Sequence, residues 1–361
     1  MQLKPLSEQT IVITGASSGI GLAAACAAAA AGANVVLAAR TREALTRAVD
    51  RVKQAGITSG GNALFVVADV TKRDDLEAVA QAATERFGGF DTWVNNAGVG
   101  IWGRIDEVPE ADKRQLFEIN FWGMVHGSEI AVEHLRLEGG ALINVGSVAS
   151  DYALPLQGIY SASKHAVKGY TEALRMELEA VGAPVSVTLV KPASIGTPMP
   201  QHVKNYTSGE AKFPPPVYSP DEVAAAILHA AVHPSRDLFV GGAAATMSAL
   251  NRRLPRLMDK VGGTFVYPAQ IGTQPATPTD NLYSGQSEGE IFGDHQGSAI
   301  RASAYTRART NPGVTLAAAG AAAAAGVGLF LWSRRGASAP TPALPAEPEQ
   351  STAEEVQAHP S

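Results

Sequence analysis

The sequence has little of several residue classes, and each scarcity excludes a class of protein. One cysteine in 361 residues excludes a disulfide scaffold and any multi-cysteine zinc or iron–sulfur site. Basic residues are outnumbered by acidic ones, and the formal net charge of −5 argues against a nucleic-acid partner held by a basic surface. Only 17% of residues are charged whereas 45% are hydrophobic, so the chain can bury a sizeable core and is not globally disordered.

Short apolar runs alternate with helical patterns through the first 245 residues. Most of these runs are apolar without polar alternation, which is typical of strands buried on both faces. The alternation predicts an α/β domain at 1–245 with a doubly wound parallel sheet. The expected strands are 10–14, 33–39, 63–68, 92–95, 141–145, 185–190 and 238–240, and the expected helices are 19–31, 42–55, 74–87, 110–136, 157–180 and 221–233.

A glycine-rich stretch, TGASSGIG at residues 14–21, follows the first expected strand. Gly15 allows a tight turn, Gly19 lets the backbone approach a pyrophosphate, and Gly21 permits close packing of the next helix, whose N-terminus favours an anion. The spacing is GxxxGxG and not the GxGxxG of the dinucleotide fingerprint. A nucleotide site is the favoured interpretation, and a strand-to-helix turn without a ligand is the alternative.

This stretch is the first of five motifs whose order resembles that of the short-chain dehydrogenase/reductase family. The resemblance covers about residues 8–245. The other motifs are Asn95-Asn96-Ala97-Gly98, Asn120, Ser147 and Tyr160-Ser-Ala-Ser-Lys164. It implies a single catalytic domain with a Rossmann fold and a C-terminal extension. It also implies an oxidoreductase that interconverts a secondary alcohol and a ketone or aldehyde by hydride transfer.

The resemblance further implies a catalytic tetrad of Asn120, Ser147, Tyr160 and Lys164. Tyr160 and Lys164 are spaced i, i+4, so they share one helix face. A nearby ammonium lowers the pKa of a phenol, which would let Tyr160 act as general acid/base. By the resemblance, Ser147 holds the substrate oxygen, Lys164 also binds the ribose hydroxyls, and Asn120 supports a water that links the lysine to solvent.

The end of the second expected strand predicts NADP(H) as the cofactor. NAD-binding folds carry an acidic residue there for the ribose 2′-OH, but this strand ends at Ala39 and Arg40. A guanidinium suits a 2′-phosphate, and a solvated surface arginine is the alternative. The expected cofactor contacts are Gly15, Ser17, Ser18, Gly19, Ile20, Gly21, Arg40, Asp69, Val70, Asn96, Ala97, Gly98, Tyr160, Lys164, Pro192, Ile195 and Thr197. No metal is expected, and Ala193 stands where the family commonly has glycine after Pro192.

Two mostly apolar stretches are expected to form the substrate pocket. They are the loop 198–217, with Met199, His202, Tyr206 and Phe213, and the residues between Ser147 and Tyr160, with Val148, Tyr152, Leu154 and Leu156. Neither stretch contains a cluster of Arg or Lys, which predicts a small apolar alcohol or carbonyl substrate. The alternative is that these side chains pack within the domain and touch no ligand.

The C-terminal part of the chain differs in composition. Residues 246–262 predict one more helix, and residues 263–312, rich in Gly, Ser, Thr, Gln and Pro, predict a poorly structured polar linker. Residues 314–332 are uncharged and Arg334 and Arg335 follow, which favours a transmembrane helix at 313–333. A soluble alanine-rich helix is the alternative. Residues 334–361 predict a disordered tail.

These patterns lead to one main functional hypothesis and one from another class. The main hypothesis is an NADP(H)-dependent oxidoreductase with a cytoplasmic catalytic domain, anchored to a membrane through 314–332. The long helices at 110–136 and 157–180 resemble those that build the family's interfaces, so we expect a homodimer or homotetramer. The alternative is a catalytically silent NADP-binding sensor or a membrane-associated scaffold.

Overall fold

The computed structural model describes residues 1–310, except 277, 279, 286–288 and 295–298. The described residues belong to one compact unit, Met1–Pro312. The transmembrane helix expected at 313–333 and the tail expected at 334–361 lie outside them. Among the described helices, none combines the length and the apolarity needed to cross a membrane.

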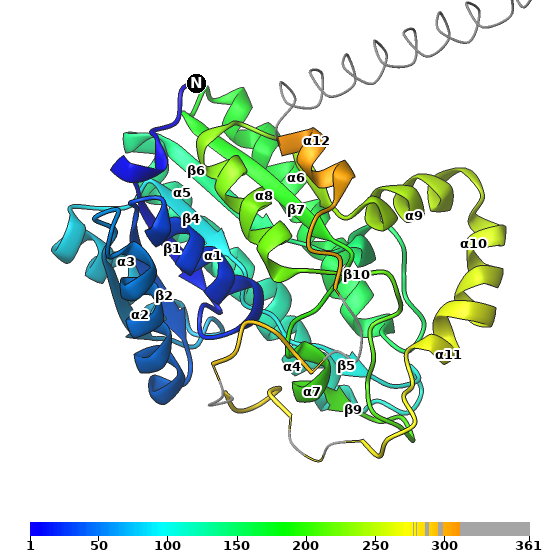
Figure 1. Ribbon diagram of the computed structural model, residues 1–361. Helices are drawn as coiled ribbons and strands as arrows, with labels where there is room; N and C mark the ends of the chain where they lie inside the picture. The colour runs from blue at the N-terminus through cyan, green and yellow to red at the C-terminus, as the bar shows by residue number, and fades with distance from the viewer. Residues whose placement is uncertain (277, 279, 286–288, 295–298, 311–361) are drawn as a thin grey trace, which may run out of the picture. The chain divides into compact units, whose positions relative to one another are not determined.

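A parallel sheet of seven strands lies at the centre of the unit, in the order β11-β7-β6-β4-β1-β2-β3 (Figure 1). The predicted doubly wound sheet is therefore confirmed. The strand order reverses between β1 and β4, and a crevice opens at such a switch outside the carboxyl ends of the strands. The strands are β1 (Thr10–Thr14), β2 (Asn34–Ala39), β3 (Ala63–Val67), β4 (Thr92–Asn95), β6 (Gly140–Val145), β7 (Val185–Pro192) and β11 (Asp237–Val240).

Helices cover both faces of the sheet because the buried strands present apolar side chains on both sides. Ile11 and Ile13 of β1 share one hydrophobic cluster with α1 (Gly19–Ala30), α2 (Arg42–Gly56) and α8 (Pro220–Val232). Val12 shares a second cluster with the helices on the opposite face. These are α3 (Arg73–Phe87), α5 (Gly123–Glu138) and α6 (Gly158–Ala180). At the start of α8, the Ser219 hydroxyl accepts from the Asp221 amide, so Ser219 is the N-cap of this helix.

Two helices expected to be continuous are interrupted. The helix expected at 110–136 contains a π-helical turn, Glu118–Trp122, between α4 (Glu110–Phe117) and α5. The helix expected at 246–262 is two helices, α9 (Gly242–Arg253) and α10 (Pro255–Val261). Pro255 causes this break, because proline cannot continue a helix from the preceding turn but fits its first position.

The structure differs from the loose linker expected at 263–312. The side chain of Leu282 is fully buried in the second cluster, and that of Gln270 is fully buried as well. Gln270 donates to the carbonyl oxygen of Pro155 at 2.7 Å, and helix α12 (Ala304–Thr310) packs against α8. The described part of this stretch gains its order from the catalytic domain, because its composition provides no core of its own.

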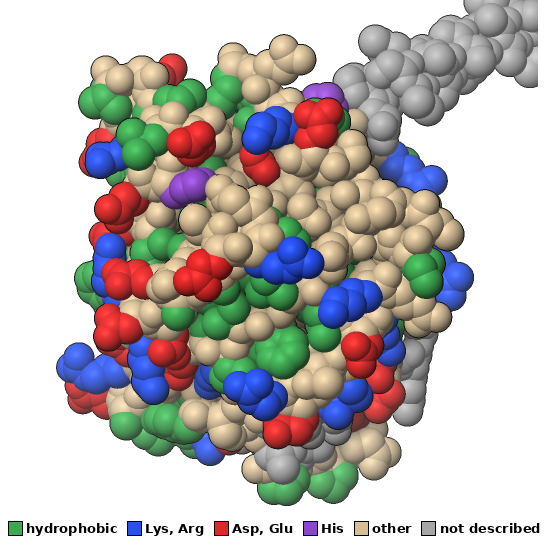
Figure 2. Space-filling view, turned by 90° about the vertical axis from the view of Figure 1, so that its left-hand side faces the viewer, with side chains coloured by type: hydrophobic (Ala, Val, Ile, Leu, Met, Phe, Trp, Pro, Cys, Tyr) green, Lys and Arg blue, Asp and Glu red, His purple; other side chains and the backbone are tan. Residues whose placement is uncertain are grey.

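Shorter elements connect the main ones around the crevice. A helical turn, Val148–Ser150, follows β6, and α7 (Met199–His202) follows β8 (Ser194–Ile195). The others are the helical turns Leu6–Glu8 and Gly262–Val266, α11 (Tyr267–Ala269), β5 (Ile101–Trp102), β9 (Lys204–Asn205) and β10 (Val217–Tyr218). On the face shown in Figure 2, acidic and basic side chains are interspersed.

Candidate active site

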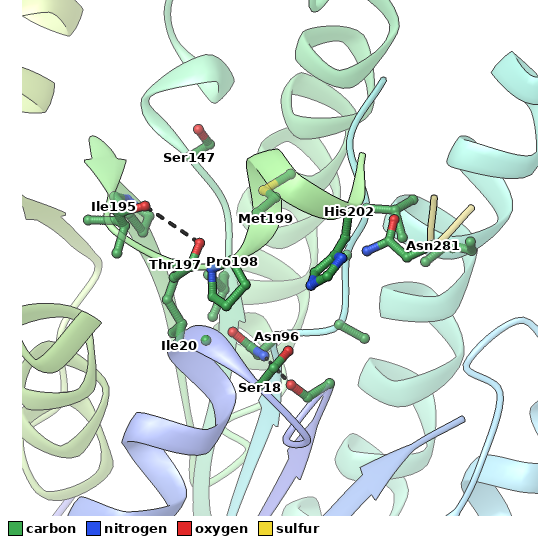
Figure 3. A pocket seen from close by; sticks show the side chains of 18 of the residues that line it. Ser18, Ile20, Asn96, Ser147, Ile195, Thr197, Pro198, Met199, His202 and Asn281 are labelled. Carbon is green, nitrogen blue, oxygen red and sulfur yellow. Dashed lines mark hydrogen bonds between the residues drawn. The ribbon is translucent and has the colours of Figure 1, made fainter. Parts of the chain in front are cut away.

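A cavity of about 250 Å³ lies at the carboxyl ends of the central strands (Figure 3). Most residues expected to bind the cofactor line it, together with three of the four expected catalytic residues. The lining includes Gly15, Ser17, Ser18, Gly19, Ile20, Arg40, Asp69, Val70, Asn96, Ala97, Gly98, Ser147, Tyr160, Lys164, Pro192, Ile195 and Thr197. Gly21 and Asn120 are not part of this lining. The fold thus brings together residues that span much of the domain's sequence.

The glycine-rich loop needs its glycines for two physical reasons. Gly15 and Gly19 have φ of +64° and +53°, a region that side chains disfavour. A Cβ on Gly21 would come within 2.4 Å of the Gly15 carbonyl oxygen, so this position permits only glycine while the helix lies so close to the loop. The loop therefore has the backbone geometry that a pyrophosphate site at the N-terminus of α1 would require.

The end of β4 is tied to this loop by Asn96. Its side-chain amide donates to the carbonyl oxygens of Thr14 and Gly15, at 3.0 and 3.2 Å. The hydroxyl of Thr14 accepts in return from the backbone amides of Asn96 and Ala97. Asn96 lines the cavity and also fixes the two strand ends together. At the end of β3, Asp69 lines the cavity and accepts from the Thr71 amide, so it also forms the turn considered as its alternative role.

Tyr160 and Lys164 face the cavity from α6, as their i, i+4 spacing predicts. The Lys164 ammonium lies 5.8 Å from the centroid of the Tyr160 ring and donates to the Val145 carbonyl oxygen at 2.8 Å. Burial lowers the pKa of Lys164 to about 8. Burial also raises the pKa of Tyr160, and a hydrogen bond with Ser147 acts against that rise. In the protein alone, the pKa of Tyr160 is therefore raised, and the lowering that we expected from the ammonium is not found.

Ser147 begins the turn Val148–Ser150 at the end of β6. Its hydroxyl accepts from the Ala149 amide at 3.1 Å, and its own amide donates to the Ser150 hydroxyl at 3.3 Å. These two bonds form a capping box, which fixes the turn at its start. The backbone therefore sets where the Ser147 hydroxyl meets the cavity.

Asn120 lies in the π-helical turn behind the cavity and is almost fully buried. Its amide group bonds the Val99 backbone in both directions, at 2.8 and 3.0 Å, and donates to the Ser163 hydroxyl. A Cβ built on Gly98 would lie 3.4 Å from Asn120 Oδ1 and 3.8 Å from Lys164 Nζ, so the two side chains approach the same point. The water-linked proton path through Asn120 stays a prediction.

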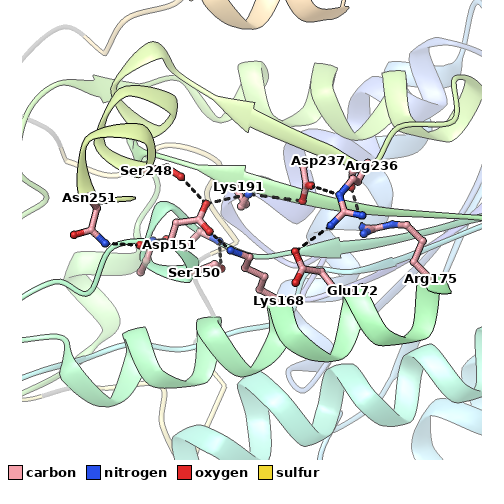
Figure 4. Close-up of polar contacts among 12 residues, drawn as sticks. Ser150, Asp151, Lys168, Glu172, Arg175, Lys191, Arg236, Asp237, Ser248 and Asn251 are labelled. Carbon is pink, nitrogen blue, oxygen red and sulfur yellow. Dashed lines mark hydrogen bonds and ion pairs between the residues drawn. The ribbon is translucent and has the colours of Figure 1, made fainter. Parts of the chain in front are cut away.

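A buried ion network holds the turn after Ser147 (Figure 4). The Asp151 carboxylate accepts from Lys168, from Lys191 at 3.0 Å and from Ser248 at 2.9 Å. Lys191 precedes Pro192 on β7, and Lys168 lies one helical turn after Lys164. Burial alone would raise the pKa of Asp151, but the hydrogen bonds from the two lysines lower it to about 2. The network joins the turn after Ser147 to β7, α6 and α9.

We expect Asp151→Asn to lower the free energy of unfolding by about 3 kcal/mol at pH 7, because it removes the nearer carboxylate of the buried Lys191 ammonium and leaves only Asp237, at 3.7 Å. The native pKa of Asp151 lies below that of an unfolded carboxyl. The stabilisation is therefore complete above pH 4 and is lost as pH falls towards 2.

Urea unfolding between pH 7 and 3 measures this difference between wild type and variant, which should narrow below pH 4. Asp106→Asn is the control, because Asp106 pairs with Arg104 on the surface and should change little. If the variant's free energy of unfolding is lower than that of wild type by the same amount at every pH, Asp151 does not titrate as stated.

The substrate end of the cavity only partly matches the expected pocket. Val148, Leu154, Met199, His202 and Phe213 line it, as predicted. Three predicted members do not. The Tyr206 hydroxyl donates to Asp112, the Tyr152 hydroxyl donates to the Met258 carbonyl oxygen, and Leu156 lines a separate, apolar cavity. Among the described lining residues the cations are Arg40 and Lys164, both at positions expected to meet the cofactor.

Among the lining residues that the sequence analysis missed, Asn281 and Gly285 come from the expected linker. The backbone carbonyls of Asn281 and Ser284 accept from the Arg40 guanidinium at 2.6 and 3.3 Å, with that of Leu282 at 3.5 Å. Arg40 is thus not the solvated surface residue considered as an alternative. No sequence pattern indicated these contacts, because they are made by backbone atoms in a segment without periodicity.

Comparison with known proteins matches the chain to one family over the part that forms the site. Residues 9–207 match the family model of short chain dehydrogenases. The chain is 41% identical over 322 residues to the uncharacterized oxidoreductase YxnA of Bacillus subtilis, a match that covers 88% of this chain and 89% of YxnA. The similarity to YxnA therefore extends well beyond the residues that the family model covers.

Two solved structures resemble the fold. A short chain dehydrogenase/reductase from Burkholderia phymatum in complex with NAD is 28% identical, with a TM-score of 0.60, over 69% of this chain and 94% of that one. L-sorbose reductase from Gluconobacter frateurii, complexed with NADPH and L-sorbose, is 27% identical, with a TM-score of 0.56, over 65% of this chain and 95% of that one.

Proposed function

The chain belongs to the short-chain dehydrogenase family, and from this membership we propose that it is an NADP(H)-dependent oxidoreductase that interconverts an apolar secondary alcohol and its ketone or aldehyde. The observation that carries the proposal is the convergence of Ser147, Tyr160 and Lys164 on the cavity that the glycine-rich loop also lines. A sensor without turnover would not require these three side chains together.

The residues that line the cavity are of the kinds that a dinucleotide would need. The close approach at Gly21 and the positive φ of Gly15 and Gly19 leave room for a pyrophosphate against the backbone. Arg40 would hold a 2′-phosphate, since the neighbouring Ala39 provides no carboxylate to repel it or to bind a free 2′-OH. Lys164 would bind the ribose hydroxyls, and Ile195 and Thr197 would meet the carboxamide. When bound, the cofactor supplies or accepts the hydride.

Three side chains of the site each have a separate role in the proton transfer. Ser147 holds the substrate oxygen beside Tyr160 through a hydroxyl whose place the capping box fixes. Tyr160 gives its phenolic proton to the carbonyl oxygen during reduction, or takes a proton from the alcohol during oxidation. Lys164 stabilises the phenolate that reduction leaves on Tyr160. A phenol is protonated at neutral pH, and burial raises the pKa of Tyr160 further, so Tyr160 can donate its proton during reduction.

A cofactor-linked screen of carbonyl compounds tests this proposal. With the full chain, we expect NADPH oxidation on lipophilic ketones to exceed that on their carboxylated or phosphorylated analogues by about tenfold or more. The reason is that the described residues of the lining include no cation beyond the two assigned to the cofactor. NADPH should be preferred to NADH by a similar factor. A preference for NADH would contradict the role of Arg40, and turnover restricted to charged or sugar substrates would contradict the apolar pocket.

Two further expectations remain proposals about the whole protein. We propose a homo-oligomer because α5 and α6 resemble the family's interface helices, and Trp122, which directly precedes α5, is 45% exposed. Sedimentation of the full chain measures the assembly size. The membrane anchor at 313–333 stays a prediction from the sequence.

A further inference from the structure

Residues 280–285 and 289–294, which follow α11 in the chain, contact the cofactor cavity and the loops beside it. We call these residues the strap. Asn281 and Gly285 of the strap line the cavity, and Figure 3 shows Asn281 beside His202 at its edge. The Asn281 amide donates to the His202 carbonyl oxygen at 2.8 Å, which joins the strap to α7.

Backbone carbonyls of the strap accept hydrogen bonds from two groups that the proposed function assigns to the cofactor's phosphates. The Gly19 amide, at the N-terminus of α1, donates to the Glu290 carbonyl oxygen at 2.8 Å. The Arg40 guanidinium donates to the carbonyl oxygens of Asn281 and Ser284. One amide hydrogen cannot serve Glu290 and a pyrophosphate at once. The strap therefore holds both expected phosphate sites with backbone carbonyls.

Contacts outside the cavity anchor the strap. Leu282 is fully buried in the core, the Tyr283 hydroxyl donates to Asp112 at 2.7 Å, and Asp280 pairs with Lys204 at 2.9 Å. A further contact joins Gly293 to Gly196, whose carbonyl oxygen accepts at 3.2 Å. The anchors lie on both sides of the carbonyls that face the cavity, so they hold these carbonyls against Gly19 and Arg40.

A phosphate can displace the carbonyls of the strap from Gly19 and Arg40. A phosphate oxygen is charged, and charge-assisted hydrogen bonds are about twice as strong as those to a neutral carbonyl. The seated strap also leaves Asn281 Oδ1 buried without a hydrogen-bond partner among the described residues, which costs free energy. A dinucleotide thus gains more at Gly19 and Arg40 than the strap loses there.

We propose that the strap is a built-in competitor of the cofactor, which must leave the Gly19 amide and the Arg40 guanidinium before NADP(H) can bind. The proposal rests on the proposed function for the identity of the ligand. The strap opposes NADPH more than NADH, because NADPH must replace the carbonyls at both groups whereas NADH must replace only the one at Gly19. The preference for NADPH then comes from Arg40, and the strap reduces it.

A reversible covalent lock tests the competition directly. A Cβ built on Gly285 lies 3.4 Å from Thr41 Cβ, close to the spacing of about 3.5–4.5 Å found in disulfides. We therefore pair Thr41→Cys with Gly285→Cys in the full chain and score the bond by counting free thiols. The reduced form of the same variant is the reference, and the oxidised wild type controls for Cys26.

The oxidised variant should bind NADPH at least about tenfold more weakly than its reduced form, because the competent state is then rarely populated. NADH affinity should fall less, and a reductant should restore both. Equal NADPH affinity of the oxidised and reduced forms would overturn the proposal.

A loosened strap should have the opposite effect. Asp280→Asn combined with Tyr283→Phe removes two anchors outside the cavity lining, and NADPH should then bind about fivefold more tightly. Tyr305→Phe, on α12, is the matched control and should leave affinity unchanged. Weaker NADPH binding by the loosened variant would mean that the strap belongs to the bound site, and would overturn the competition.

Both measurements read binding and need no substrate, so they separate the strap from the reaction. A strap effect without turnover on any carbonyl contradicts the proposed reaction alone. Turnover without a strap effect contradicts the strap alone. A wild-type chain and a loosened variant that bind neither nucleotide contradict both proposals.

Discussion

Replacing Tyr160 with phenylalanine should lower kcat for carbonyl reduction by about 10²- to 10⁴-fold, the usual contribution of a general acid. The ring packs against two hydrophobic clusters of the domain, and phenylalanine keeps that packing while it removes the proton donor. NADPH affinity should stay within about twofold of wild type, since the lost hydroxyl serves the substrate oxygen. Steady-state kinetics on the best ketone and fluorescence titration with NADPH measure the two effects separately.

Tyr152→Phe is the matched control for this change. Tyr152 is also buried beside the site, but its hydroxyl donates to the Met258 carbonyl oxygen and does not line the cavity. Its loss should reduce stability with little effect on kcat. If Tyr160→Phe keeps its turnover, Tyr160 is not the proton donor.

The rate of carbonyl reduction should fall as pH rises through about 8. Reduction leaves a phenolate on Tyr160, and the Lys164 ammonium stabilises it only while the lysine is protonated. Burial sets the pKa of Lys164 at about 8, so the ammonium is present below that pH and is lost above it. Alcohol oxidation should instead gain rate with pH, because Tyr160 must first lose a proton whose pKa burial raises.

Lys164→Met should abolish the fall in reduction rate near pH 8. It should also lower kcat at pH 7 by about 10²-fold, as expected when a stabilising charge is removed from a water-excluded site. Profiles of kcat against pH at saturating NADPH measure both. Lys168→Met is the control, because Lys168 lies one turn further along α6 and pairs with Asp151 outside the cavity. If the reduction rate of Lys164→Met still falls near pH 8, the titration of another group causes that fall.

Much of the site was predictable from the sequence because its residues follow strands that a simple pattern reveals. Buried apolar runs predicted the strands, and parallel strands bring their carboxyl ends to one edge. The glycine-rich loop after β1, Asn96 after β4 and Ser147 after β6 therefore had to meet there. The i, i+4 spacing similarly placed Tyr160 and Lys164 on one helix face.

What the sequence did not reveal depends on backbone atoms and on single anchors. The contacts to Arg40 and Gly19 come from main-chain carbonyls, which every residue carries. Leu282 is one apolar residue in a polar stretch, so no periodicity marked it as buried. The break between α9 and α10 is different, because Pro255 stands inside the expected helix and was a visible signal.

The contact between Gln157 and Gln270 limits where the chain can be truncated for expression. The family match ends at residue 207, and a cut at 245 or 262 would look safe from the sequence. Such a cut would remove Gln270 and leave the buried side-chain amide of Gln157 without its hydrogen-bond acceptor. Gln157 directly precedes α6, the helix that carries Tyr160. It would also leave a hole in the core where Leu282 was. An expressible fragment of this protein should extend at least through α12.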